Sequence, residues 1–251
     1  MIDTLVHLAF VLALPPLLTG VIAKTKAAFA GRNGPPLLQG YWDLAKLFRK
    51  GSVLPSGSTW VFLAGPVAGV AAPLLASLLL PFGGHEAPLS FAGDMVLFAY
   101  LFALARFFTA SAALDTGSAF EGMGAAREVA FSALAEPALF FGFVALARIS
   151  GSLSLSGMLG SGPGWVTAGA PLVLVAASWA VVLLAENCRI PFDDPNTHLE
   201  LTMIHEVMVL DHGGPAFGLV LYGASVKLFV LSAVFLRLVF PFNAPDPNPH
   251  R

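Results

Sequence analysis

Apolar residues occur in six long runs, and polar residues are gathered in the connections between them. The runs are continuous rather than alternating, so they predict helices rather than strands. About 20 apolar residues suffice to cross the roughly 30 Å hydrocarbon core of a bilayer. The predicted spans are residues 4–23, 60–80, 95–113, 131–149, 165–185 and 217–240. The pattern therefore predicts an all-α, polytopic transmembrane helix bundle of about six spans.

The composition agrees with a chain surrounded by membrane lipid. Of 251 residues, 57% are hydrophobic and 11% are charged, whereas soluble domains carry about 25% charged residues. The first run lacks the basic stretch and cleavage site of a signal peptide, so we expect a retained helix. We predict a single integral membrane domain over residues 1–251 with a C-terminal tail at 241–251, and no nucleic-acid partner.

Basic residues are distributed unevenly among the connections. They lie in the connections at about 24–59, 114–130 and 186–215, and the connections at 81–94 and 150–164 contain no Lys or Arg. Under the positive-inside rule, the three charged connections face the cytoplasm. This predicts a multi-pass protein of the cytoplasmic (inner) membrane with both termini in the periplasm.

The first charged connection contains "GPPLLQGYWDLAKLFRKG". Apolar residues recur at helical spacing between residues 41 and 48, with Asp43 and Lys46 largely on the other side. Such a segment is typical of an amphipathic helix in the membrane interface. Two interpretations stay open: a basic anchor for anionic lipid, and a docking surface or cavity wall.

The second charged connection and the fourth run concentrate carboxylates near the membrane. The candidate site residues of the connection are Asp115, Glu121, Arg127 and Glu128. Its glycines at 117, 122 and 124 are expected to break the helix and to let the backbone pack closely. Glu136 falls inside the fourth run, where a carboxylate is costly and is by default a functional candidate. We predict that Glu136 belongs to a proton or polar pathway, the alternative being a hydrogen-bonded structural acid.

The third charged connection reads "AENCRIPFDDPNTHLELTMIHEVMVLDHGGP". Asp194 and the proline after it suit the start of a helix, and Gly213 suits its end. We therefore predict an amphipathic helix with a titratable face that lies against a cavity or partner, or is simply solvated. The candidate residues are Glu186, Arg189, Asp193, Asp194, His198, Glu200, His205, Glu206 and Asp211.

The sequence favours no metal or redox centre held by this chain alone. The histidines at 198, 205 and 212 are seven residues apart, which does not suit a metal site on one helix, and Cys188 is the single cysteine. Lys227 lies within the last run and is expected to pair with a carboxylate inside the bundle. We group Lys227 with Glu136, Glu186, Glu128 and Arg127 as candidates for proton transfer or coupling.

Three motifs carry a resemblance to a known family. The third connection, together with "FEGMGAAREVAFSALAEPAL" and "GPPLLQGYWDLAKLFRK", resembles the membrane subunit of energy-converting NiFe hydrogenases of the formate hydrogenlyase type. More distantly, it is similar to the quinone-cavity subunit of respiratory complex I, which reads roughly "AETNRAPFDLPE". Members of the family usually continue with about two further spans.

The resemblance implies a non-redox subunit that anchors a peripheral arm and links its electron transfer to proton or sodium translocation. The implied partners are an iron–sulfur small subunit, a NiFe-type large subunit and antiporter-like membrane subunits, which would hold the iron–sulfur clusters and any NiFe centre. A quinone stays open as a ligand. The chain would then have no catalytic centre of its own. The alternatives are a stand-alone ion transporter, for which we see no inverted repeat, and a pure membrane anchor.

Overall fold

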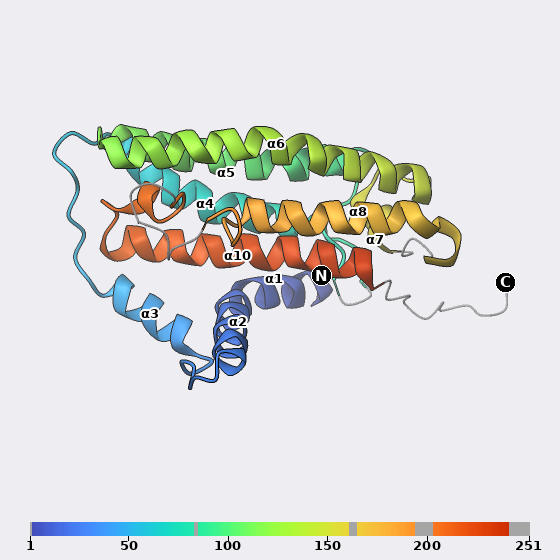
Figure 1. The fold of residues 1–251 in the computed structure, drawn as a ribbon, viewed down its shortest axis with the longest axis horizontal. Coiled ribbons are helices and arrows are strands. Elements are labelled where there is room, and N and C mark those ends of the chain that lie inside the picture. Colours follow the sequence, from blue (N-terminus) through green and yellow to red (C-terminus); the bar gives the residue numbers. More distant parts are fainter. Residues whose placement is uncertain (1, 83–84, 161–164, 194–202, 241–251) are drawn as a thin grey trace.

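The computed structural model describes residues 2–82, 85–160, 165–193 and 203–240, and every regular element within them is helical (Figure 1). The elements are α1 (Ile2–Ala13), α2 (Pro15–Phe29), α3 (Gln39–Phe48), α4 (Trp60–Ser77), α5 (Asp94–Asp115), α6 (Ala119–Ser150), α7 (Leu155–Gly160), α8 (Trp165–Glu186), the short 3-10 turn η1 (Val207–Val209) and α10 (Gly214–Val239).

Five of the six predicted spans correspond to single long helices, and the first corresponds to two helices. Within the described ranges, α4, α5, α6, α8 from Gly169 onward and α10 are each long and apolar enough to cross a membrane. The helices α1 and α2 together form a sixth candidate span, bent by 44°. The predicted all-α transmembrane fold is therefore confirmed.

The first span differs from the prediction because two helices replace one. The two prolines that open α2 have no N–H to donate to the last turn of α1, so backbone carbonyls at the bend need other partners. The hydroxyl of Tyr222 donates to the carbonyl of Leu12 at 2.9 Å, and the hydroxyl of Tyr41 donates to that of Ala13. The bend is thus tied to α10 and α3, and α2 projects away from the bundle (Figure 1).

Close helix packing builds the bundle around α4, α5 and α10. A Cβ atom on Gly223 of α10 would lie 2.6 Å from the carbonyl oxygen of Gly69 in α4, so this crossing requires glycine. Phe143 of α6 meets Phe98 of α5 and Trp179 of α8 edge to face, at ring-centroid distances of 6.0 and 4.9 Å. These contacts pack α10 closely against α4, and α6 against α5 and α8.

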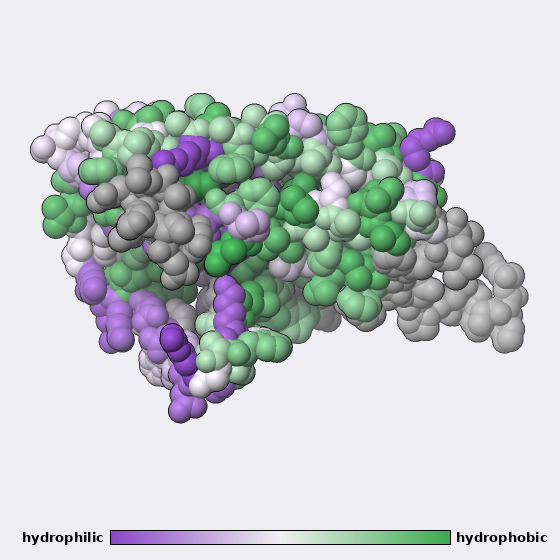
Figure 2. All heavy atoms as spheres, viewed as in Figure 1, coloured by the Kyte–Doolittle hydropathy of each residue, from purple (hydrophilic) through white to green (hydrophobic). Residues whose placement is uncertain are grey.

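The three charged connections lie at one end of the bundle, at the left of Figure 1, and α3 is the helix within the first of them. Hydrophilic residues gather over α2 and α3, whereas the visible sides of the long helices are mainly hydrophobic (Figure 2). This distribution suits helices whose sides face lipid and whose charged connections face water.

The second connection is mostly helix, which corrects the predicted break at its glycines. The one break falls at Gly117, with φ of +71°, in the short turn between α5 and α6. Gly124 lies within α6, where an added Cβ would stand 3.0 Å from the carbonyl oxygen of Ile204. This glycine allows close packing of the third connection rather than ending the helix.

The predicted amphipathic helix of the third connection is wrong for the residues described there. Residues 203–213 contain only the 3-10 turn η1. The N–H of His205 donates to the Asp193 carboxylate at 3.1 Å instead of to a helical carbonyl. Met203, Ile204 and Met208 are buried, so this segment folds inward as irregular chain. The predicted N-terminal half, residues 194–202, lies outside the described residues.

Candidate functional site

Arg106 lies near the middle of α5, and its guanidinium contacts three carboxylates. Its Nη1 is 2.5 Å from Oε1 of Glu136, its Nε is 3.3 Å from Oε1 of Glu128, and its Nη2 donates to Oε1 of Glu186. Lys227 of α10 approaches the same Glu186, with Nζ 3.0 Å from Oε2. These five side chains, termed the Arg106 cluster, join α5, α6, α8 and α10.

The Arg106 cluster has an imbalance of charge in a buried setting. With every group ionised, three carboxylates face two cations, which leaves one net negative charge. The side chains of Arg106 and Glu186 are 6% and 7% exposed, whereas that of Glu136 is 41% exposed. Uncompensated charge is costly away from water. The cluster is thus one cation short of neutrality, and Glu136 is the most exposed of its three carboxylates.

Cys188 connects the Arg106 cluster to the third connection. Its thiol donates a hydrogen bond to Oε2 of Glu128, with Sγ at 3.2 Å. Burial, and secondarily the Glu128 carboxylate, raises the pKa of the Cys188 thiol. The sulfur therefore stays protonated at neutral pH and acts as a donor to Glu128.

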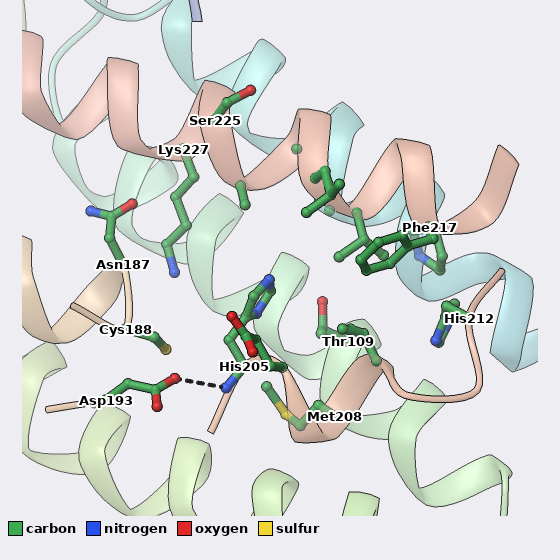
Figure 3. Close-up of a pocket in the computed structure, with 18 of the residues that line it drawn as sticks. Thr109, Asn187, Cys188, Asp193, His205, Met208, His212, Phe217, Ser225 and Lys227 are labelled. Carbon is green, nitrogen blue, oxygen red and sulfur yellow. Dashed lines mark hydrogen bonds between the residues drawn. The ribbon is translucent and has the colours of Figure 1, made fainter. Parts of the chain in front are cut away.

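A cavity of about 840 Å³ lies beside the Arg106 cluster, within the range of ligand-sized sites. Figure 3 shows Lys227, Cys188, Asp193 and His205 gathered at one part of its wall. Glycine and proline residues of α4 form an apolar part: Gly65, Pro66, Gly69 and Pro73. The cavity thus combines charged groups with closely packed, uncharged helix surface.

Two side chains of α6 fasten the third connection to the bundle. Nη1 of Arg127 donates to the carbonyl of Met203 at 3.3 Å, and Oε1 of Glu121 accepts from the N–H of Asp211 at 3.0 Å. Both contacts lie near the beginning of α6, upstream of Glu128. Movement of this connection would therefore be transmitted to the helix that carries two members of the Arg106 cluster.

Two histidines of the third connection are held neutral. Burial lowers the pKa of His205; Glu128 and Asp193 act in the opposite direction, and Lys227 reinforces the lowering. Burial also lowers the pKa of His212, whose ring stacks on Phe62 at a centroid distance of 4.0 Å. Their titration is shifted to more acidic pH than that of free histidine.

The structure brings most of the predicted site residues together. Those in the Arg106 cluster are Glu128, Glu136, Glu186 and Lys227. Those that fasten or order the third connection are Glu121, Arg127, Asp193, His205 and Asp211. Those that line the cavity without belonging to either group are Asp43, Arg189 and Glu206. The pairing of Lys227 with a carboxylate agrees with the prediction from its position.

Two predicted residues lie apart from the site. Lys46 is exposed on α3, with its ammonium 3.9 Å from Asp43. Asp115 accepts hydrogen bonds from the N–H and hydroxyl of Thr59, at 2.6 and 2.9 Å, and so orders the start of α4. Three further candidates lie outside the described residues: Asp194, His198 and Glu200.

Sequence reasoning missed Arg106, the centre of the cluster. The third run, residues 95–113, is apolar enough to be assigned as a span in spite of this charge. The signal was nevertheless present, because an ionisable residue within a span is by default a functional candidate. Across the ranges given for the fold, no three His, Cys, Asp or Glu side chains converge as metal ligands.

The chain is similar to proteins of a known family over nearly its whole length. The NADH dehydrogenase family profile matches residues 2–246. The chain is 34% identical to formate hydrogenlyase subunit 4 of Escherichia coli, over 95% of this chain and 77% of that protein. It is 33% identical to hydrogenase-4 component C of the same organism, over 96% and 76%. These matches confirm the resemblance carried by the three motifs.

Two more distant similarities agree with these matches. A subunit of the NADH-quinone oxidoreductase of Bordetella pertussis is 27% identical, over 85% of this chain and 60% of that protein. Among solved structures, a chain of the membrane-bound sulfane sulfur reductase, an archaeal respiratory membrane complex, matches with a TM-score of 0.80. It is 22% identical over 93% of this chain and 76% of that chain, and supports the fold alone.

Proposed function

The chain belongs to the NADH dehydrogenase family, and from this premise we propose a function that the Arg106 cluster supports. It is a membrane subunit of an energy-converting hydrogenase or complex I-like oxidoreductase. It docks a peripheral redox arm and links electron transfer there to translocation of H⁺ or Na⁺. Its relatives include two hydrogenase-type subunits and a quinone oxidoreductase subunit.

The observation that carries the proposal is the contact of Arg106 with three carboxylates inside a membrane bundle. Ionisable groups are rare within membrane spans because they are costly there, and they mark ion pathways. A structural ion pair needs one anion for each cation, whereas this cluster has an excess carboxylate. That excess gives the cluster the capacity to take up and release a proton.

The residues of the Arg106 cluster have different roles in this proposal. The planar guanidinium of Arg106 can hold several carboxylates at once, which a lysine ammonium cannot do with the same geometry. Lys227 balances Glu186 on the α10 side. Glu136 is half-exposed at the side of the bundle. In this proposal, the proton leaves the cluster from Glu136 toward a neighbouring membrane subunit.

The docking surface lies where the three charged connections meet. The third connection is fastened to α6 by Arg127 and Glu121. Cys188 lies in the same connection and donates a hydrogen bond to Glu128, so the connection also contacts the Arg106 cluster. An iron–sulfur small subunit and a NiFe-type large subunit would dock there and hold the redox centres. Antiporter-like membrane subunits would lie against the Glu136 side. This assignment places the charged connections in the cytoplasm and the termini in the periplasm.

The cavity could hold a quinone as the electron acceptor. Its charged wall suits the carbonyl oxygens of a quinone headgroup, and its apolar α4 surface suits the face of the quinone ring. A quinone would occupy it if the partner arm is of the complex I type, and a hydrogenase-type partner needs none. Nickel-binding cysteine pairs in the partner large subunit would identify the hydrogenase type.

The proposal is tested in the assembled complex reconstituted in vesicles. Glu136→Gln should strongly reduce ion translocation while the peripheral arm stays attached and electrons still flow. Glu86→Gln, at an exposed position in the connection at the opposite end, is the matched control and should change neither. Unchanged translocation in Glu136→Gln would favour a pure anchor. Full translocation by the purified chain without partner subunits would favour a stand-alone transporter.

A further inference from the structure

His205 is a half-buried titratable residue that the Arg106 cluster does not use directly. Its backbone is held by the Asp193 carboxylate at 3.1 Å. Its ring projects into the cavity near Lys227 and Cys188 (Figure 3). Within the described part of the chain, its Nε2 is buried and has no hydrogen-bond partner.

An unpaired ring nitrogen in such a place calls for a physical explanation. A buried polar atom without a partner is destabilising, because it has lost the hydrogen bonds that water would give it. Oδ1 of Asp193 and Nδ1 of His212 are likewise buried without a hydrogen-bond partner in the described part of the chain, whereas the Asp211 N–H and the Glu121 carboxylate are paired. The imidazole of His205 is among the groups that line the cavity (Figure 3).

The charges around His205 are nearly balanced. On α6 it faces Glu128, and on α10 it faces Lys227. The segment after α8 adds Asp193 and Arg189. Other charged groups in the same cavity wall are Arg106, Glu186, Lys26, Asp43 and Glu206. Burial lowers the pKa of His205 and favours the neutral imidazole, while the Glu128 and Asp193 carboxylates act in the opposite direction.

The position of His205 also suits a transfer toward the Arg106 cluster. Glu128 is the cluster carboxylate whose charge acts on His205, and its Oε2 accepts a hydrogen bond from the Cys188 thiol. The cluster carries one excess negative charge when fully ionised, so it can accept one proton. His205 therefore stands between a cavity that supplies protons and carboxylates that can receive them.

We infer that His205 is the proton-exchange residue between the cavity and the Arg106 cluster. A proton from cavity water binds the lone pair of neutral His205, forming an imidazolium. The imidazolium gives a proton to a carboxylate of the cluster and returns to the neutral imidazole, leaving the cluster one charge more positive. This inference rests on the proposed function, because it assumes that the cluster carries protons.

The experiment uses the assembled complex in vesicles and follows proton translocation across a range of pH. His205→Ala should lower translocation by on the order of 10²-fold, the usual contribution of a positioned acid–base group. Imidazole added to the medium should restore much of it, because the cavity admits a small base. In wild type, translocation should fall as pH rises above the His205 pKa, and His205→Asn should remove this dependence.

His85→Ala is the matched control, since His85 is exposed in the connection at the opposite end. It should keep the wild-type pH profile and should not respond to imidazole. Normal translocation in His205→Asn, or failure of imidazole to restore His205→Ala, would overturn the role of His205. If Glu136→Gln impairs translocation in the same vesicles, that failure leaves the proposed function intact. If Glu136→Gln has no effect, the proposed function itself fails.

Discussion

Nζ of Lys227 lies 3.0 Å from Oε2 of Glu186, while Oε1 of the same carboxylate accepts a hydrogen bond from Arg106. One carboxylate at the end of α8 thus joins cations from α5 and α10. Because the third connection begins directly after Glu186, displacement of that connection would alter both ion pairs at once. This relationship gives the Arg106 cluster a direct link to the surface where a partner would dock.

Removal of the central cation should destabilise the fold. Arg106→Gln leaves carboxylates from two helices without their shared partner, so the free energy of unfolding should fall by about 3–5 kcal/mol. Thermal unfolding of the purified protein in detergent measures the change. Arg148→Gln, at an exposed position near the end of α6, should stay within about 0.5 kcal/mol of wild type. Equal stability of the two variants would mean that the cluster contributes nothing to folding.

Two glycines of α6 should respond oppositely to alanine. A Cβ at Gly124 would lie 3.0 Å from the Ile204 carbonyl oxygen, whereas at Gly122 the nearest atom, from Leu114, is at 3.9 Å. Gly122→Ala should stabilise the helix by roughly 0.5–1 kcal/mol. Gly124→Ala should instead loosen the third connection and increase its cleavage by protease. Protection equal to that of Gly122→Ala would show that the two segments are not packed as described.

Acidification should destabilise the protein through its neutral, buried histidines. The pKa of His212 is lowered in the fold, so the unfolded chain binds more protons below about pH 6.5. The contribution of neutral His212 is complete above that pH and declines as pH falls toward its folded pKa. The slope for one group reaches at most about 1.4 kcal/mol per pH unit. His212→Gln should reduce the loss of stability between about pH 7 and pH 5, as measured by chemical unfolding; an unchanged slope would contradict this origin.

The proposed orientation predicts which side of the membrane each end reaches. The native thiol of Cys188 is only partly accessible and has a raised pKa, so it should react slowly with maleimides. Lys46→Cys on α3 should react only with reagent on the cytoplasmic side. Glu86→Cys, in the connection at the opposite end, should react only from outside. Labelling of Lys46→Cys from outside would reverse the orientation.

The sequence was sufficient to predict the spans because hydrophobic run length has a direct physical meaning in a bilayer. It was also sufficient to select Glu136, Glu186 and Lys227, since charges in or near spans are costly. It did not predict that they share Arg106, because this contact depends on how separate helices pack. The short apolar stretch around Ile204 was misassigned as helix because periodicity alone does not reveal that it packs against Gly124.

The central claim is that the Arg106 cluster couples electron transfer in a partner arm to ion translocation. Its most direct test is the number of ions moved per electron pair in vesicles containing the assembled complex with Arg106→Lys. Lysine keeps the charge but cannot hold three carboxylates in the same geometry. The account predicts continued electron transfer with a markedly lower ratio, and an unchanged ratio in Arg148→Lys. A wild-type ratio in Arg106→Lys, with the arm attached, would contradict it.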